Sequence, residues 1–311
     1  MYYQLLPELK PITLEEVDEN ALTAGYIEFD ELQSAIERFG FTDVEAADCL
    51  ADRDNYRNSV DAFETYTFGL VNIVNVTDVY AVSDRLALFF RKNLLLVASL
   101  RDLDGSTRES FMTALRRYKP ESVTLEKLIF AMLESSIARD AQGLARFEKE
   151  VDMLEERVAL GTAEKDLSAT LYQLKKQLLF LRGYYDQLID IGEALEENEN
   201  DIFETDALHY FGLLTNKANR LCDEVNRLCD ELNQLRDAHI ASMDYHLNNI
   251  MEFFTLITVV FMPLTLMVGW YGMNFANMPE LIAKWGYPVF IVACLVVTAG
   301  ILIWFKKKKW F

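Results

Sequence analysis

Residues 253–305, FFTLITVVFMPLTLMVGWYGMNFANMPELIAKWGYPVFIVACLVVTAGILIWF, contain the two apolar runs that decide the fold of this chain. No Asp, Glu, Lys, Arg or His occurs in residues 253–279 or in residues 285–305. Each run is long enough to form a membrane-spanning helix, since roughly 20 residues cross a hydrocarbon core about 30 Å thick. Both runs lie far from the N-terminus, unlike a signal peptide. The pattern predicts two transmembrane helices joined by a short loop.

Basic residues beside the two runs predict their orientation. Four consecutive lysines, Lys306 to Lys309, begin the tail 306–311, whereas the loop 274–286 carries Lys284 and the opposite charge of Glu280. Because Lys and Arg are retained on the cytoplasmic side of a membrane, the tail is expected in the cytoplasm. Two spans return the chain to its starting side, so residues 1–252 are expected there too. The expected location is the plasma (inner) membrane, with both termini cytoplasmic.

Charge and motifs narrow the function classes. The formal charge of −19 at pH 7 disfavours nucleic acid as a partner and concentrates cations instead. Neither a GxxxxGK[ST] phosphate loop nor a GxSxG nucleophile motif occurs, so the sequence predicts neither an enzyme nor an organic cofactor. His209, His239 and His246 lack the spacing of a metal site and are interpreted as surface residues of a helix.

The rest of the chain predicts an α/β cytoplasmic domain followed by helices. In residues 1–105, two stretches rich in β-branched and aromatic residues, 63–76 and 85–100, indicate strands, and the sequence RKN at 91–93 indicates a hairpin turn inside the second. Acidic, Leu-containing stretches near 28–39 and 43–52 are typical of helices. Residues 106–206 show apolar residues at three- and four-residue spacing, which predicts antiparallel helices with an acidic turn at 197–206.

A single long helix is expected beyond that turn. Residues 207–252 form a stem that continues into the first transmembrane helix, 253–273, and a helix of this length would extend roughly 95 Å. Pro263 lies inside the first span, where a kink is tolerated. The second span is expected at 287–305.

One face of the first span is smaller and more polar than the others. Residues at steps of four, four, three and four share it: Phe254, Thr258, Met262, Thr265 and Gly269. Extended down the stem, the same face reaches Asn248 and Met251. Small and hydroxylated residues favour close helix packing in membranes, so this periodicity is compatible both with a helix–helix contact and with the lining of a pore.

The loop between the spans supplies a more specific pattern. YGMNF at 271–275, MPEL at 278–281, KWGYP at 284–288 and the lysine tail together resemble the CorA family of divalent-cation channels, most strongly over residues 237–311. The resemblance implies a funnel-shaped homopentamer in the lipid bilayer, with the first span lining a central pore. It also implies that Gly272, Met273 and Asn274 surround the outer mouth and select the ion, with Glu280 in the outer loop.

The resemblance further implies membrane-potential-driven uptake of Mg²⁺, with Co²⁺ or Ni²⁺ as secondary ions. Two alternatives stay open. One is a zinc transporter of the same superfamily, although such relatives generally depart from Gly-Met-Asn. The other is a membrane-anchored helical scaffold or sensor that conducts nothing, which would explain the stem but not the polar face.

Regulation is where this sequence departs from the family. In well-known members, carboxylates on the upper stem bind Mg²⁺ between subunits and close the channel. The positions here that correspond to them by counting back are Leu213 and Asn216, followed by Lys217, and none is acidic. The resemblance therefore implies weak Mg²⁺ feedback, or feedback through other stem acids: Asp237, Asp223, Glu224, Asp230 and Glu231.

Overall fold

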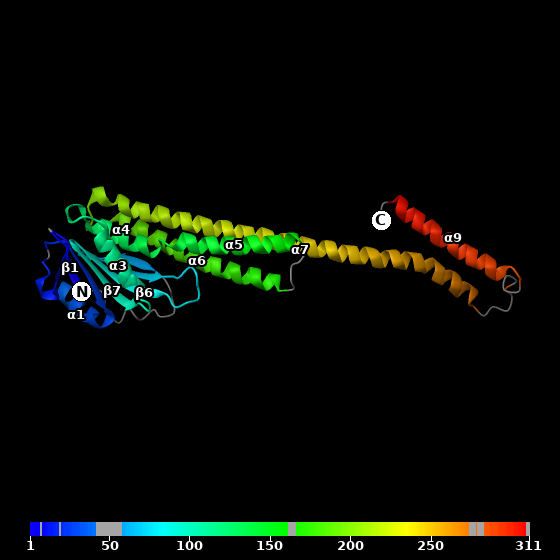
Figure 1. The fold of residues 1–311 in the computed structure, drawn as a ribbon, viewed down its shortest axis with the longest axis horizontal. Helices are drawn as coiled ribbons and strands as arrows, with labels where there is room; N and C mark the ends of the chain where they lie inside the picture. Colours follow the sequence, from blue (N-terminus) through cyan, green and yellow to red (C-terminus); the bar gives the residue numbers. More distant parts are fainter. Residues whose placement is uncertain are drawn as a thin grey trace. The chain divides into compact units, whose positions relative to one another are not determined.

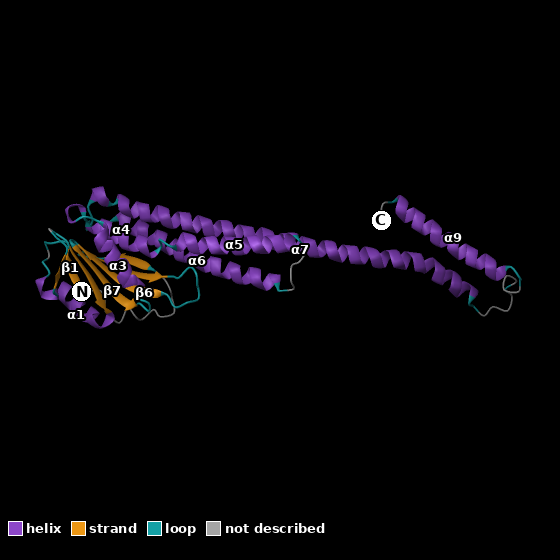
Figure 2. Ribbon diagram, in the orientation of Figure 1, coloured by secondary structure: helices purple, strands orange, loops and turns teal. Residues whose placement is uncertain are grey.

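The computed structural model describes residues 1–6, 8–18, 20–41, 58–160, 166–273, 278 and 283–308 (Figure 1). The chain divides into two compact units, Met1–Arg236 and Asp237–Phe311. The first contains a mixed sheet and a layer of helices, and the second contains helix alone among its described residues (Figure 2).

A seven-stranded sheet forms the middle layer of the first unit. Its strands are β1 (Tyr2–Gln4), β2 (Lys10–Ile12), β3 (Thr23–Glu28), β4 (Ser59–Ala62), β5 (Thr67–Ile73), β6 (Asp84–Arg91) and β7 (Leu94–Arg101). They lie in the order β2-β1-β3-β7-β6-β5-β4. Only the β3–β7 pair is parallel, and every other pair of neighbours is antiparallel. A parallel pair needs a long crossover, and the chain from 29 to 93, which contains α1 and three strands, provides it.

Alternate residues of the central strands enter two separate hydrophobic cores. Leu88 and Val97 face one core, while Phe89 and Leu96 face the other. This is the period of two that a strand buried on both faces produces. The side of Phe89 is covered by α1 (Phe29–Phe39), whose residues Leu32 and Phe39 belong to that core, among others.

The opposite face of the sheet is covered by the helical layer. Its elements are α3 (Ser106–Arg117), α4 (Leu125–Ser136), α5 (Asp140–Ala159), α6 (Leu167–Glu197) and the first part of α7 (His209–Tyr271), with the short 3₁₀ turns η2 (Pro120–Ser122) and η3 (Thr205–Ala207) between them. A third 3₁₀ turn, η1 (Leu14–Glu16), packs through Leu14 on the other core, that of Phe89. Leu128 of α4, Leu181 of α6 and Leu214 of α7 are fully buried in the same core as Leu88. Sheet and helices therefore share one core across the strand-to-helix change at residue 105.

Two turns expected from the sequence are confirmed. Strands β6 and β7 pair as an antiparallel hairpin, with Asn93 in a left-handed conformation (φ 64°) at its turn. At the acidic turn, Asn198 ends α6 with φ 48° and Asn200 anchors the turn to the sheet. The Asn200 amide donates to the carbonyls of Phe63 (2.8 Å) and Tyr66 (3.1 Å). The helix expected near 43–52 lies outside the described residues.

The second unit contains two helices that meet the length and composition of membrane spans. Helix α7 runs without interruption through Pro263 to Tyr271, and α9 covers Gly286–Lys307, where the sequence predicts 287–305. The most apolar 18-residue segment has a mean hydropathy of 2.0 in α7 and of 2.6 in α9. Large apolar side chains such as Phe253, Leu266 and Val296 are more than half exposed. Exposed apolar surface on this scale requires lipid or another protein surface to cover it.

The contact between α6 and α7 provides a stability test. A Cβ added to Gly192 of α6 would overlap the Thr215 hydroxyl of α7 and lie 3.3 Å from the Thr215 Cβ. We expect Gly192→Ala to destabilise the protein by about 1–3 kcal/mol, because the packed helices have to separate. Gly183→Ala on the same helix is the control: nothing lies within 4 Å of the added Cβ. It should be neutral or stabilising by about 0.5–1 kcal/mol. Thermal unfolding of both variants measures the difference, and equal shifts would contradict it.

Candidate functional site

The predicted polar face of the first span is exposed along its whole length. Thr258, Thr265 and Gly269 are all exposed, as are Phe254 (58%) and Met262 (64%). Further down α7, Asn248 and Met251 are exposed as well. All seven predicted residues therefore lie on a surface that no described part of this chain covers.

The opposite face of α7 is the one that is partly covered. Leu256, Val260 and Met267 are half-buried. At about 100° per residue they lie together, roughly opposite Thr258 and Thr265. Met267 and Tyr271 share a small pocket with residues of α9, and the Tyr271 ring contacts the Phe290 ring edge-on at 5.1 Å. The second span thus packs away from the polar face and leaves it open.

A groove of about 700 Å³ follows the open face. It is lined by Ile257, Thr258, Phe261, Met262, Thr265, Leu266, Gly269, Trp270 and Met273. A side chain added at Gly269 would meet no atom within 4 Å, so the absence of a side chain there widens the groove and is not required by packing within the chain.

Hydrogen bonding gives the two threonines of this face a defined polarity. The Thr258 hydroxyl donates to the Phe254 carbonyl and the Thr265 hydroxyl to the Phe261 carbonyl, both at 2.8 Å. Each hydroxyl proton is thereby engaged in the helix, and the oxygen lone pairs remain as acceptors. Acceptor oxygens suit a cation or the water molecules around it and do not suit an anion.

The outer end of α7 leads directly into the Gly-Met-Asn sequence. The Gly272 amide donates to the Val268 carbonyl at 2.9 Å and the Met273 amide to the Trp270 carbonyl at 3.4 Å, so helical bonding ends here. Gly272 and Met273 are exposed. Asn274 and Glu280, two further predicted site residues, lie outside the described residues.

Comparison with known proteins identifies the family. The model of the CorA-like Mg²⁺ transporter proteins matches residues 27–307, nearly the whole chain. The chain belongs to the CorA family. It is therefore a membrane transporter for divalent cations and not an enzyme.

Individual relatives agree with this assignment over most of their length. The cobalt/magnesium transport protein CorA of Thermotoga maritima is 30% identical over 289 residues, which cover 90% of this chain and 80% of the relative. The CorA magnesium transporter of Methanocaldococcus jannaschii has the same fold, with a TM-score of 0.78 at 17% identity over 100% of this chain and 98% of that one. The cytoplasmic domain of ZntB from Vibrio parahaemolyticus shares the fold of the soluble part (TM-score 0.58, 10% identity, 78% of this chain and 97% of that one).

The predicted regulatory acids of the stem are in different environments. Glu224 and Glu231 both bind Arg227, at 2.5 and 2.6 Å, and Arg227 also holds Glu148 of α5 at 2.8 Å. These contacts raise the pKa of Arg227 further above its ordinary value, through its hydrogen bonds to Glu224 and Glu148. Two of the candidate carboxylates are therefore already ion-paired.

The other candidate stem positions lie at the surface of the helix. Asp223, Asp230 and Asp237 are exposed. Leu213 and Asn216, which correspond to regulatory positions in the family, are exposed as well. The following residue, Lys217, binds Glu134 of α4 at 2.8 Å.

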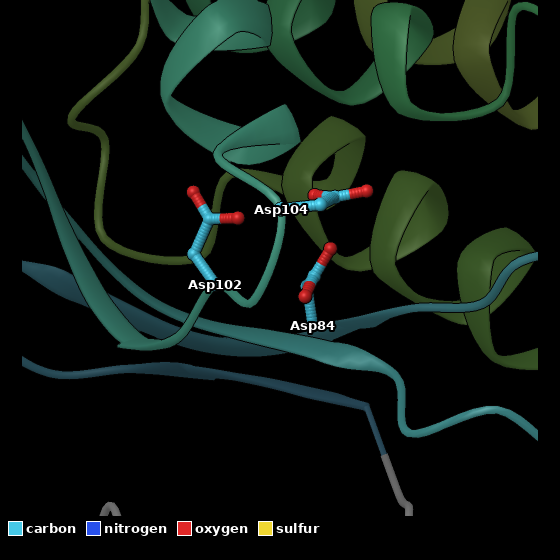
Figure 3. A group of neighbouring side chains, drawn as sticks. All are labelled: Asp84, Asp102 and Asp104. Carbon is cyan, nitrogen blue, oxygen red and sulfur yellow. The ribbon is translucent and has the colours of Figure 1, made fainter.

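Sequence reasoning missed a group of three carboxylates at the start of α3. Asp84, Asp102 and Asp104 place oxygen atoms within 4.8 Å of one another (Figure 3). Among the described residues of this single chain, this is the group of His, Cys, Asp and Glu that comes close enough to hold a metal ion. The sequence DLDG at 102–105 is a turn and helix-start signal that could have identified it.

Hydrogen bonds show that this group caps α3. Asp102 accepts the Gly105 amide (2.9 Å) and the hydroxyl of Thr107 (2.5 Å). Asp104 accepts the Ser106 amide (2.9 Å), and its hydrogen bonds with Ser106 lower its pKa. Burial raises the pKa of Asp84, which accepts the Ser106 hydroxyl (3.0 Å). Negative charge at a helix N-terminus is stabilising, so the cluster has a structural role without an ion.

The threonine geometry makes a testable prediction. Thr258→Val and Thr265→Val retain the shape of the side chain and remove the acceptor oxygen, so each should lower divalent-cation flux several-fold. Thr298→Val on α9 is a matched control, because the Thr298 hydroxyl also donates to a helix carbonyl, that of Cys294, at 2.8 Å. Flux measured with an ion-sensitive dye in proteoliposomes should be unchanged in this control. Equal effects of all three substitutions would show that the face of α7 has no special role.

Proposed function

We propose that the chain is one subunit of a homopentameric channel for membrane-potential-driven Mg²⁺ uptake, with Co²⁺ or Ni²⁺ as secondary ions. The observation that carries this proposal is the exposed polar face of α7, which faces away from α9 and leads to Gly272. Membership of the CorA family and the magnesium and cobalt transport carried out by its relatives support it.

The geometry of two spans supports an oligomer. Two helices cannot enclose a water-filled path, and the exposed polar face of α7 needs another protein surface or water to cover it. Copies of α7 arranged around an axis would turn Thr258 and Thr265 toward one another and toward water. Helix α9 would then lie on the outside, between α7 and lipid. The number five comes from the family.

The outer mouth suits an ion that keeps its water. Mg²⁺ dehydrates reluctantly, and a ring of Asn274 amide oxygens and Gly272 carbonyls would accept hydrogen bonds from its hydration shell. A ring of carboxylates would bind the ion more tightly and release it more slowly. Met273 would pack the turn, and Glu280 in the outer loop would attract cations from outside.

Below the mouth, apolar side chains provide the constrictions. Met262 and Phe254 are bulky residues of the polar face and would gate the pore by excluding water. Met251 and Asn248 continue the same face toward the cytoplasmic end.

The membrane potential supplies sufficient driving force without a nucleotide. Moving two charges through 100 mV releases roughly 4.6 kcal/mol. This corresponds to accumulation of more than about a thousandfold. We propose an inner-membrane location with both termini in the cytoplasm, because Lys306, Lys307 and Lys308 are exposed at the end of α9.

The function is tested by flux through the selectivity ring. Asn274→Ala should abolish Mg²⁺ uptake into proteoliposomes under an inside-negative potential, because it removes the amide oxygens from every subunit. Asn277→Ala, three residues further along the same loop, is the matched control and should retain uptake. Gel filtration must show the same assembly for both variants. Normal uptake by the assembled Asn274→Ala protein would refute the role of this ring.

The same assay separates the alternatives. A zinc transporter would accumulate Zn²⁺ in preference to Mg²⁺ and respond to a proton gradient, and the fold shared with the ZntB domain makes this comparison necessary. A scaffold or sensor would show no flux of any divalent ion.

Regulation by internal Mg²⁺ is expected to be weak. A site between subunits needs several oxygen ligands, and its affinity falls with the number of carboxylates. Leu213 and Asn216 supply no carboxylate, and Glu224 and Glu231 are held by Arg227. We therefore expect current to persist at low millimolar internal Mg²⁺. Leu213→Asp combined with Asn216→Asp should introduce stronger closure, whereas strong closure in the unmodified protein would contradict the prediction.

A further inference from the structure

Asp140, the first residue of α5, is a buried carboxylic acid that the proposed ion pathway does not use. Only 5% of it is exposed. It accepts a hydrogen bond from the Tyr185 hydroxyl of α6, at 3.0 Å. Tyr185 is itself fully buried, with the ring of Tyr184 at 5.2 Å.

Lys217, the cation whose charge acts on Asp140, forms its ion pair with a different carboxylate. Lys217 of α7 acts on Asp140 through its charge, but its ion pair is with Glu134 of α4 at 2.8 Å. Glu134 also binds Arg117 of α3. Although partial burial opposes ionisation, these two cations hold the pKa of Glu134 below its ordinary value. Lys217 thus neutralises Glu134, which stays ionised. The negative charge of an ionised Asp140 would be only partly neutralised.

The titratable groups that interact with Asp140 are Tyr184 and Tyr185 of α6 and Lys217 of α7. Lys217 is paired with Glu134 of α4, and Cys222 of α7 acts on Tyr185. Burial raises the pKa of Asp140 to about 7, while the hydrogen bond from Tyr185 and the charge of Lys217 oppose the rise. Burial also raises the pKa values of both tyrosines, so they remain neutral donors.

This arrangement lies at the junction of α5, α6 and α7, and α7 is the helix that continues into the first span. The N-terminus of α5 favours a negative charge on Asp140, but burial with incomplete pairing makes the ionised form costly. A conformation that lets water reach Asp140 therefore binds its proton less tightly. When a group binds a proton more tightly in one of two conformations, protonation shifts the equilibrium toward that conformation.

We propose that Asp140 is a proton sensor for transport: its protonated form favours the closely packed arrangement of α5, α6 and α7, and loss of the proton loosens that packing around α7. The sensor rests on the proposed channel function, because its output is ion flux.

The direction follows from linkage. The packed state binds the proton more tightly than a water-exposed state, in which the pKa would approach its ordinary value. The advantage of the packed state is therefore complete at low pH and is lost as the pH rises through neutrality. Asparagine has no proton to lose, so Asp140→Asn should resemble the acid form at every pH.

The test measures Mg²⁺ flux in proteoliposomes of the full-length protein at internal pH 6 and pH 8. Unmodified protein should differ in flux between the two values, and Asp140→Asn should show the pH 6 flux at both. Asp152→Asn removes an exposed carboxylate from the same helix and should keep the unmodified profile. Tyr185→Phe removes the donor to the ionised form, so the midpoint of the profile should move to higher pH.

The outcomes distinguish the sensor from the channel. Flux that is equal at both pH values, or a pH response that persists in Asp140→Asn, would overturn the sensor and leave the channel intact. No flux at any pH would overturn the channel and, with it, the output of the sensor. Tyr185→Phe keeps the proposal falsifiable if Asp140→Asn fails to assemble, because an unmoved midpoint would refute it.

Discussion

A side-chain oxygen on a membrane-spanning helix has to find a hydrogen-bond partner or face water, and this constraint organises the second unit of the protein. The hydroxyls of Thr258 and Thr265 donate hydrogen bonds to carbonyls of α7, and their oxygen lone pairs remain as acceptors on an exposed face. The second span packs on the opposite side, through Met267, Tyr271 and Phe290. In the proposed channel this face would line a shared, water-filled axis, and membership of the CorA family supports that arrangement.

The first part of α7 is packed into the core of the first unit. Its core joins the sheet to the helical layer, with Leu88 of β6 and Leu214 of α7 in one cluster. Close contact at Gly192 and the anchoring of Asn200 to the sheet leave little freedom at the α6–α7 turn. A helix held this closely transmits changes in its environment as discrete repacking, because densely packed interiors deform little.

Electrostatics in this acidic chain depends on which carboxylates are already engaged. Arg227 holds Glu148, Glu224 and Glu231, and the cluster of Asp84, Asp102 and Asp104 caps α3. Acid-rich composition is thus a poor guide to metal binding here, since both groups have protein partners. Asp140 differs from them in its burial, since only 5% of it is exposed.

The sequence by itself determined the elements whose signals are local. Apolar length predicted the two spans, a period of 3.6 predicted α7 and its small-residue face, and RKN predicted the β6–β7 hairpin, because each depends on neighbouring residues alone. The Gly-Met-Asn pattern and the lysine tail were sufficient to indicate the family. Only the tertiary structure showed that α9 packs opposite Thr258 and Thr265, that Arg227 of α7 pairs with Glu148 of α5, and that Asp140 is buried against Tyr185. Those facts join residues up to 79 positions apart, as in the Arg227–Glu148 pair. Such contacts are set by how whole faces of helices pack, which a local pattern does not encode.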